Sequence, residues 1–188
     1  MPDALSPATI LPAKPESVRT ADYRDEDAAY SLLVAMHRHN DGGWHFPYDP
    51  SVVLARIETA TRPDPRTRTN PQDQRVGTIG VIGPLGGPLI GIVGVFLDPP
   101  MWFTSALAPT ELFLFVRKGE RGAARHERDL MAYAEWFHAG LKAGMPNYKL
   151  PFPLLTGFMH LGSRFEGMER LWRRLCGGRK AGVLFMKD

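Results

Sequence analysis

The sequence has little cysteine, no long apolar run and no marked excess of charge of either sign. Cys176 is the only cysteine among 188 residues, so the chain can form neither an internal disulfide nor a cysteine zinc cluster, which favours a reducing, cytoplasmic setting. No apolar run approaches the roughly 20 residues that a membrane-spanning helix needs, and no signal-peptide pattern is present, so no membrane partner is expected. A net charge of +3 is only a weak indication of an anionic partner.

What remains is the composition of a globular chain, with 44% hydrophobic and 23% charged residues. Residues 1–16 differ from the rest because they carry four prolines, and they are predicted to form an extended arm. Residues 17–188 are predicted to form one domain. A proline-rich arm frays unless something holds it, so contact with the domain or with another protein is expected.

The hydrophobic pattern alternates between strand and helix periods along the domain. It predicts an α/β fold in which a mixed central sheet is flanked by helices. The predicted strands are 17–20, 75–82, 88–97, 111–116, 149–158 and 182–186, with a hairpin turn at 83–87. The predicted helices are 25–39, one from Pro50 to about Thr61, one starting near Arg125, and a last one around 165–175.

Three segments in this order resemble a known family. They are Glu111-Leu-Phe-Leu-Phe-Val116, Leu130-Met-Ala-Tyr-Ala-Glu-Trp136, and Arg170-Leu-Trp-Arg-Arg-Leu175 followed by Gly182-Val-Leu-Phe185. Their order and spacing resemble the GNAT family of acyl-CoA N-acyltransferases, and most closely the GNAT-like proteins of tailed phages. The resemblance implies a GNAT-like central sheet. It also implies a phage-encoded protein in the host cytoplasm that is incorporated in the virion if it is structural.

In the GNAT family the loop after the central strand binds the pyrophosphate of acetyl-CoA through the pattern Arg/Gln-x-x-Gly-x-Gly/Ala. Small residues there let backbone N–H groups and a helix N-terminus approach the phosphates. In this chain Ala124 replaces the first glycine, His126 takes the second small position, and Leu130 comes one residue late. The other register places Arg125 and Glu127 at the small positions. Both registers break the motif.

The resemblance assigns the cofactor to a short stretch of chain. The strand backbone would hold the pantetheine arm and the loop would hold the pyrophosphate, through Phe113, Leu114, Phe115, Val116, Arg121, Gly122, Ala123 and Ala124. Because bulky side chains fill the space that phosphates need, the loop is predicted to be too crowded for productive acetyl-CoA binding, and no cofactor is expected. The plainer interpretation is a basic surface loop that caps a helix.

Glu111 matches the strand-start glutamate that some GNAT members use as general base. A carboxylate beside an apolar strand has a raised pKa and could deprotonate an amine near Trp44–Tyr48. The alternative is a strand-end carboxylate paired with an arginine. Trp172 stands where the family often has an acidic tyrosine, and indole cannot donate that proton. No metal site is expected, because His37 and His39 point to different sides of their helix.

Two functions follow. The favoured one is a GNAT-fold protein used for its surface, as a phage structural or assembly component with protein partners. The degraded loop, the arm and the apolar segment Pro99–Phe103 support it. The alternative is an acetyl-CoA-dependent N-acetyltransferase acting on an amine of a small molecule or protein. The basic region Arg170–Lys180 predicts nucleic acid as a further partner.

Overall fold

The computed structural model describes residues 12–39, 48–62, 77–98, 108–144 and 155–156. Its elements follow the predicted order as far as the strand expected at 149–158. They are β1 (Arg19–Thr20), η1 (Tyr23–Asp25), α1 (Glu26–His39), α2 (Pro50–Thr61), β2 (Gly77–Ile82), β3 (Gly91–Asp98), β4 (Ala108–Val116), α3 (Ala123–Gly144) and β5 (Leu155–Thr156). The helix expected around 165–175 and the strand expected at 182–186 lie outside the described residues.

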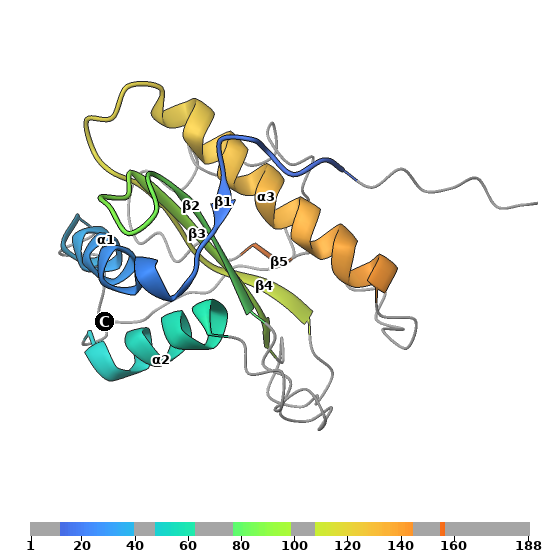
Figure 1. Ribbon diagram of the computed structural model, residues 1–188, viewed down its shortest axis with the longest axis horizontal. Coiled ribbons are helices and arrows are strands. Elements are labelled where there is room, and N and C mark those ends of the chain that lie inside the picture. The colour runs from blue at the N-terminus through green and yellow to red at the C-terminus, as the bar shows by residue number, and fades with distance from the viewer. Residues whose placement is uncertain (1–11, 40–47, 63–76, 99–107, 145–154, 157–188) are drawn as a thin grey trace, which may run out of the picture.

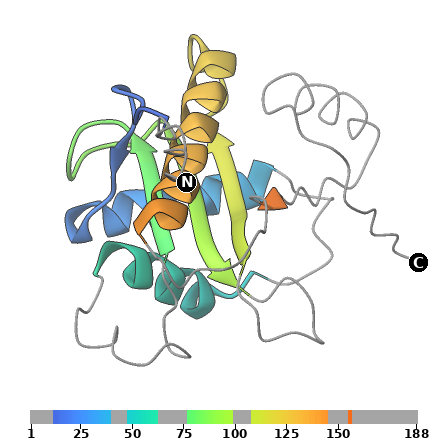
Figure 2. The same ribbon diagram turned by 90° about the vertical axis from the view of Figure 1, so that its right-hand side faces the viewer.

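The strands form one mixed sheet in the order β1-β2-β3-β4-β5. Strands β1 to β4 pair antiparallel with one another, and β5 runs parallel to β4. Figure 2 shows the strands in this order across the view, with the short β5 beyond β4. The predicted α/β architecture with a mixed central sheet and flanking helices is therefore confirmed.

Four predicted boundaries are wrong by two or three residues. β1 begins at Arg19 rather than residue 17. β3 begins at Gly91 rather than residue 88, because the hairpin loop continues until the Ile90 N–H donates to the Ile82 carbonyl (2.9 Å). Pro88 has no N–H to offer the ladder. β4 begins at Ala108, three residues before Glu111, and α3 begins at Ala123 rather than near Arg125.

The two faces of the sheet are covered by different helices. Helices α1 and α2 lie on one face and α3 on the other (Figure 1). The core under α1 and α2 contains Leu32, Ile57 and Phe96, and the core under α3 contains Val95, Leu130 and Tyr133. Periodic apolar residues on each helix supply this burial. None of the helices in the described ranges is long and apolar enough to cross a membrane.

Tyr133 links α3 to strands β1 and β2 of the sheet through hydrogen bonds. Its hydroxyl lies 2.7 Å from Thr78 Oγ1 and donates to Thr20 Oγ1 (2.9 Å). Its ring packs on Gly80, where an added Cβ would lie 2.5 Å from the ring. The Lys14 ammonium lies over the Tyr133 ring, 5.6 Å from its centroid. The described end of the predicted arm, residues 12–16, thus contacts the protein's own domain, while residues 1–11 lie outside the described residues.

A buried carboxylate, Asp25, connects β1, the hairpin turn and the start of α1. Asp25 is fully buried, and its two oxygens accept hydrogen bonds from Arg19 Nη1 and Nη2 (2.6 and 2.7 Å). The Asp22 and Gly86 N–H groups donate to the same carboxylate, both at 3.0 Å. Arg19 also donates to the Gly83 and Pro84 carbonyls, which fixes the hairpin turn against the start of α1. Although burial opposes the charge, these donors lower the pKa of Asp25 to about 2.

Candidate functional site

The predicted site residues gather along β4 and the loop that leads into α3. The strand is interrupted by a bulge, because Gly94 of β3 faces Phe113 whereas the next residue, Val95, faces Glu111. Leu112 is therefore the extra residue and its side chain is partly exposed. Bulges of this kind re-aim a strand and are frequent beside functional sites. Here the bulge separates Glu111 from the stretch Phe113–Val116.

Beyond the bulge, β4 has backbone groups that no described strand satisfies. The Arg117 N–H donates to the Ile90 carbonyl (2.7 Å), so residues of the same parity face β3. Residues of a strand alternate between its two edges, so the N–H groups of Leu114 and Val116 point to the opposite edge. The described residues of β5 pair only with Thr110 and Glu111. This stretch of β4 is here called the free edge, Leu114–Val116.

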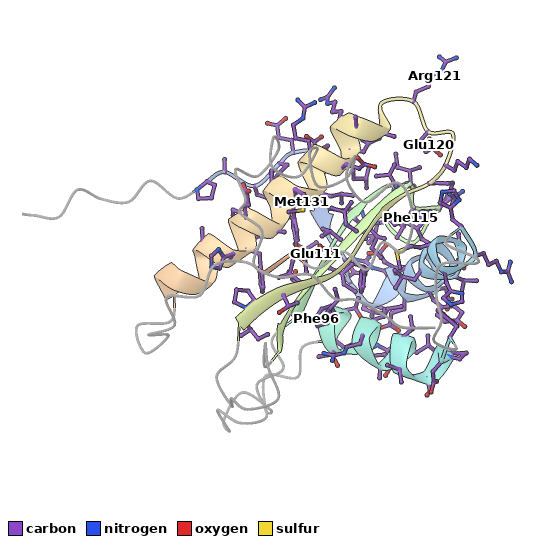
Figure 3. All side chains as sticks on the ribbon, turned by 180° about the vertical axis from the view of Figure 1, so that it is seen from behind. Phe96, Glu111, Phe115, Glu120, Arg121 and Met131 are labelled. Carbon is purple, nitrogen blue, oxygen red and sulfur yellow. The ribbon has the colours of Figure 1, made fainter. Side chains whose placement is uncertain are left out.

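Glu111 lies at the inner end of the free edge. It faces Val95 across the ladder, so its side chain lies on the α3 face of the sheet (Figure 3). The residue is 2% exposed, and its Oε2 atom is buried without a hydrogen-bond partner among the described residues. Burial raises the pKa of Glu111 to about 8. Its side chain takes part in no ion pair with an arginine of the described residues.

The loop after the free edge turns through two glycines in the left-handed region, Gly119 (φ 86°) and Gly122 (φ 78°). The turn at Gly122 starts α3, since its carbonyl accepts from the Arg125 and His126 N–H groups (2.8 and 3.0 Å). The N–H groups of the first turn of a helix have no partner within the helix. Arg121 is exposed and points away from the body of the protein (Figure 3).

His126 covers part of this helix start. Its Nε2 would lie 3.9 Å from a Cβ added at Gly122, so the ring folds back over the loop. Its Nδ1 is buried without a hydrogen-bond partner. Ala124 is exposed and Ala123 is partly buried. Of the four predicted loop residues, Arg121, Gly122 and Ala124 are thus exposed, and the imidazole of His126 lies beside the glycine turn.

Of the other residues named from the sequence, some belong to the described ranges and some do not. Tyr48 packs against the rings of Tyr30 and His37, on the α1 face of the sheet, and burial raises the pKa of Tyr48 to about 12. His39 lies near Phe115, with ring centroids 6.3 Å apart. The described part of the chain holds no group of three or more metal-ligating side chains. Trp44, Pro99–Phe103, Trp172 and the region Arg170–Lys180 lie outside the described residues.

Sequence reasoning missed two features of the site. The bulge at Leu112 depends on pairing with β3, and no local signal in β4 reveals it. The second is the fold-back of His126, which the sequence presented only as a large residue at a position that favours a small one. The bulge arises from pairing between strands, whereas the position of the His126 ring is set locally at the start of α3.

Neither the family models nor the curated proteins give a match to this sequence. The comparison with solved structures gives matches to the fold. The BH1408 protein from Bacillus halodurans, solved as a tetramutant, superposes with a TM-score of 0.55 at 15% identity, covering 91% of this chain and 98% of that one. AAC(6')-Iy, solved with the bisubstrate analogue CoA-S-monomethyl-acetylneamine, gives a TM-score of 0.53 at 13% identity, covering 91% and 96%.

A ribosomal-protein-alanine N-acetyltransferase from Brucella melitensis biovar Abortus 2308 gives a TM-score of 0.50 at 13% identity, covering 91% of this chain and 97% of that one. The chain has the fold of the GNAT acetyltransferases. At these identities the likeness concerns the fold alone, because one fold supports many functions. What the GNAT fold does in this protein depends on its own residues.

The residues present fit an acyl-CoA in part. The free edge offers the outward N–H groups of Leu114 and Val116 to the amides of an extended arm, in the manner of strand addition. The glycine turn and the first turn of α3 offer N–H groups and a positive dipole end to phosphates. His126 is the feature that opposes this fit, because its large side chain stands where the GNAT pattern has a small residue, although Gly122 itself is exposed.

Proposed function

We propose that this protein is an acyl-CoA-dependent N-acyltransferase in which Glu111 is the general base. One observation carries the proposal: a fully buried carboxyl with an unpartnered oxygen lies at the inner end of a strand edge that is open in the described residues. A buried, unpartnered carboxylate is costly to stability. Such a cost is typical of groups whose perturbed pKa serves catalysis.

Donor binding rests on the free edge and the α3 start. Leu114 and Val116 would orient the donor through their backbone N–H groups, and Arg121 with the first N–H groups of α3 would neutralise its phosphates. The fold neighbour solved with a CoA analogue supports such binding for this fold. Acetyl-CoA supplies an acyl group that the thioester activates toward amines.

Glu111 would take the proton that makes the acceptor reactive. An amine enters mostly as an ammonium ion, and loss of one proton to the Glu111 carboxylate frees the nitrogen lone pair. The nitrogen then forms the C–N bond as the thioester C–S bond breaks, and the second proton of the nitrogen leaves with the thiol. A base with a pKa of about 8 is suited to this transfer near neutral pH. The acceptor would reach Glu111 directly at the free edge or through one water.

The test is release of free thiol from acetyl-CoA in the presence of amines from several classes, including small polyamines, amino sugars and peptide N-termini. We expect acceptor-dependent release from the natural protein. Glu111→Gln keeps the shape and removes the base, so the rate should fall by about 100-fold or more. Glu58→Gln, on the exposed face of α2, is the matched control and should leave the rate unchanged. Equal rates for Glu111→Gln and the natural protein would refute the role of Glu111.

The second candidate is a GNAT-fold protein that works through its surface, as a phage structural or assembly component. The large His126 side chain beside Gly122 favours it, because the GNAT pattern has a small residue at the position of His126. Calorimetric titration with acetyl-CoA separates the two. Binding well below millimolar supports the enzyme, whereas no binding at millimolar acetyl-CoA together with a stable complex with another virion protein supports the surface role.

A further inference from the structure

The described part of the arm, residues 12–16, lies along one side of α3 (Figure 1). Three residues of this helix, spaced four and three positions apart, share the side that the arm contacts: Asp129, Tyr133 and Trp136. Ser17, directly after the arm, donates from its Oγ to Asp129 Oδ2 (2.6 Å), and Lys14 lies at the two aromatic rings. The arm therefore runs antiparallel to α3 and contacts it at two points.

The Lys14 ammonium lies in a notch between the two rings. The ring centroids of Tyr133 and Trp136 are 5.3 Å apart, and the ring planes are tilted by 46°. Lys14 Nζ lies over both rings, 5.6 Å from the Tyr133 centroid and 5.4 Å from the Trp136 centroid. It also donates to Thr20 Oγ1 (3.2 Å), which accepts from the Tyr133 hydroxyl as well. The faces of aromatic rings attract a cation, so these contacts depend on the charge of Lys14.

The arm has few other attachments. None of the side chains of residues 12–16 is fully buried, and no carboxylate of the described residues pairs with Lys14. Holding an extended segment in one conformation costs roughly 1–2 kcal/mol of backbone entropy per residue. Loss of a single charged contact can therefore change the balance between a docked and a released arm.

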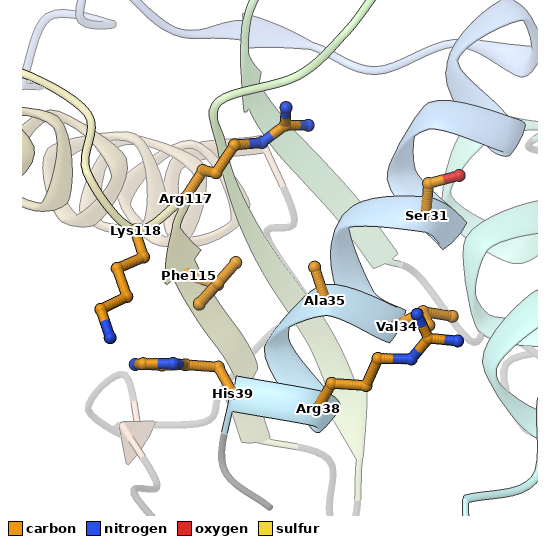
Figure 4. Close-up of a pocket in the computed structure, with 8 residues that line it drawn as sticks. All are labelled: Ser31, Val34, Ala35, Arg38, His39, Phe115, Arg117 and Lys118. Carbon is orange, nitrogen blue, oxygen red and sulfur yellow. The ribbon is translucent and has the colours of Figure 1, made fainter.

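These contacts are separate from the acyl-transfer site. Thr20 of β1 lies in the same row of the sheet as Leu114 of β4, three strands away, which is roughly 14 Å. The pocket beside the free edge, whose lining includes His39, Phe115 and Lys118, is part of the donor end of β4 (Figure 4). Lys14 contacts neither the free edge nor this pocket. A role for Lys14 therefore does not rest on acyl transfer at Glu111.

We propose that Lys14 is a charge-dependent latch that holds the arm on α3, and that N-acetylation of its side chain opens this latch. In that step the ammonium loses one proton to water, and the nitrogen forms a C–N bond to the acyl carbon of a thioester such as acetyl-CoA. The C–S bond breaks, and the second proton leaves with the thiol. The product is a neutral amide, which has lost the charge that the rings attract. Release of the arm uncovers the ring of Tyr133, which is fully buried while the arm is docked.

The test is amide hydrogen exchange of the full chain at Val18, whose N–H donates to the Pro15 carbonyl of the arm (3.2 Å). Nε-acetyl-lysine in place of Lys14, and separately Lys14→Met, should speed this exchange at least about fivefold, the factor that corresponds to two weak cation–π contacts. Lys14→Arg keeps the charge and should exchange as the natural protein does. The Ala21 N–H, which donates to the Ile79 carbonyl of β2 (2.8 Å), is the internal reference and should not change.

Two further variants sharpen the test. Nε-acetyl-lysine in place of Lys118, an exposed lysine of the loop after β4, is the matched control and should leave exchange at Val18 unchanged. In a Trp136→Leu background one of the two rings is already gone. Lys14→Met should therefore have a smaller effect on Val18 exchange there than in the natural protein. Because each comparison is made within one background, a general loss of stability on Trp136→Leu does not enter the ratio.

Four results would overturn the proposal. They are unchanged exchange at Val18 with the acetylated Lys14, Lys14→Arg exchanging as fast as Lys14→Met, equal effects of Lys14→Met in both backgrounds, and equal acceleration at Ala21. The last would mean that the whole fold loosens and not the arm alone. None of these outcomes depends on acyl transfer by this protein, so a failure of the enzyme proposal leaves the latch testable.

Discussion

Two buried carboxylates, Asp25 and Glu111, show how differently one fold treats the same chemical group. The side chain of Asp25 accepts four hydrogen bonds, two of them from Arg19, and its pKa falls to about 2. Glu111 has a buried oxygen with no hydrogen-bond partner in the described part of the chain, and its pKa rises to about 8. The hydrogen bonds around Asp25 hold the hairpin turn against the start of α1, so this carboxylate stabilises the fold. At Glu111 a poorly solvated carboxyl lies beside the free edge of β4, which is a condition for proton transfer.

The largest effect is expected from Glu111→Gln. The variant should lose about 100-fold or more of kcat/KM for acyl transfer, because the base is gone while the side-chain volume is kept. The rate of the natural protein should rise with pH up to the pKa of about 8, as the carboxylate forms. Steady-state rates from pH 6 to 9 measure both. If Glu111→Gln leaves the rate and its pH profile unchanged, Glu111 has no role in proton transfer. Its role would then be structural, as that of Asp25 is.

The next effect concerns stability at the other carboxylate. Arg19→Met removes both guanidinium donors and leaves the Asp25 charge buried, which should cost about 3 kcal/mol of the free energy of unfolding. Urea unfolding measures the loss. Arg24→Met, which breaks only an exposed pair with Asp22, is the control and should change little. Equal small effects for both arginines would mean that Asp25 does not depend on Arg19.

The pH dependence of stability should have opposite signs at the two sites. The folded pKa of Glu111 is raised from 4.5 to about 8, so between these values the folded state keeps a proton that the unfolded chain has lost. Its contribution therefore falls as the pH rises through this window. For Asp25 the folded pKa is lowered from 3.8 to about 2, so its contribution is full above 3.8 and is lost as the pH falls toward 2.

Melting curves of the natural protein and Glu111→Gln from pH 4 to 9 check this sign. The variant lacks the titrating group, so its stability relative to the natural protein should increase steadily from pH 4.5 to 8. A difference that stays constant over this range would place the folded pKa of Glu111 near its ordinary value.

The smallest effect is expected at the α3 start. His126→Gly removes the ring beside Gly122 and should lower the dissociation constant for acetyl-CoA several-fold, and adding Ala124→Gly should lower it further. A glycine in the first turns of a helix costs up to about 1 kcal/mol of stability, so a melting curve accompanies each titration. Weaker binding by a folded His126→Gly variant would show that the imidazole contributes to the phosphate site instead of crowding it.

Most of the fold could be predicted from the sequence because its patterns are local. The Asp49-Pro50 cap, the apolar period of α3 and the strand Glu111–Val116 each indicated their element. The candidate site was only half predictable. Glu111 and the strand backbone were named from the resemblance, but the bulge, the free edge of β4 and the lack of a partner for Glu111 Oε2 among the described residues are long-range properties.

The hydrogen-bond network of Asp25 could not be predicted from the sequence either, since Arg19 and Gly86 meet the carboxylate only after β1 and the hairpin turn are in place. Contacts of this kind are set by packing and not by local pattern.

The most direct test of the account is a titration with acetyl-CoA followed through backbone amide chemical shifts. The account predicts saturable shifts of the Leu114 and Val116 amides, whose N–H groups point to the open edge of β4, together with shifts at Gly122 and at Ala123 where α3 starts. The affinity should lie below millimolar. Saturation without movement of these amides, or no saturable shift at several millimolar acetyl-CoA, would contradict the proposal that the free edge of β4 and Glu111 form an acyl-transfer site.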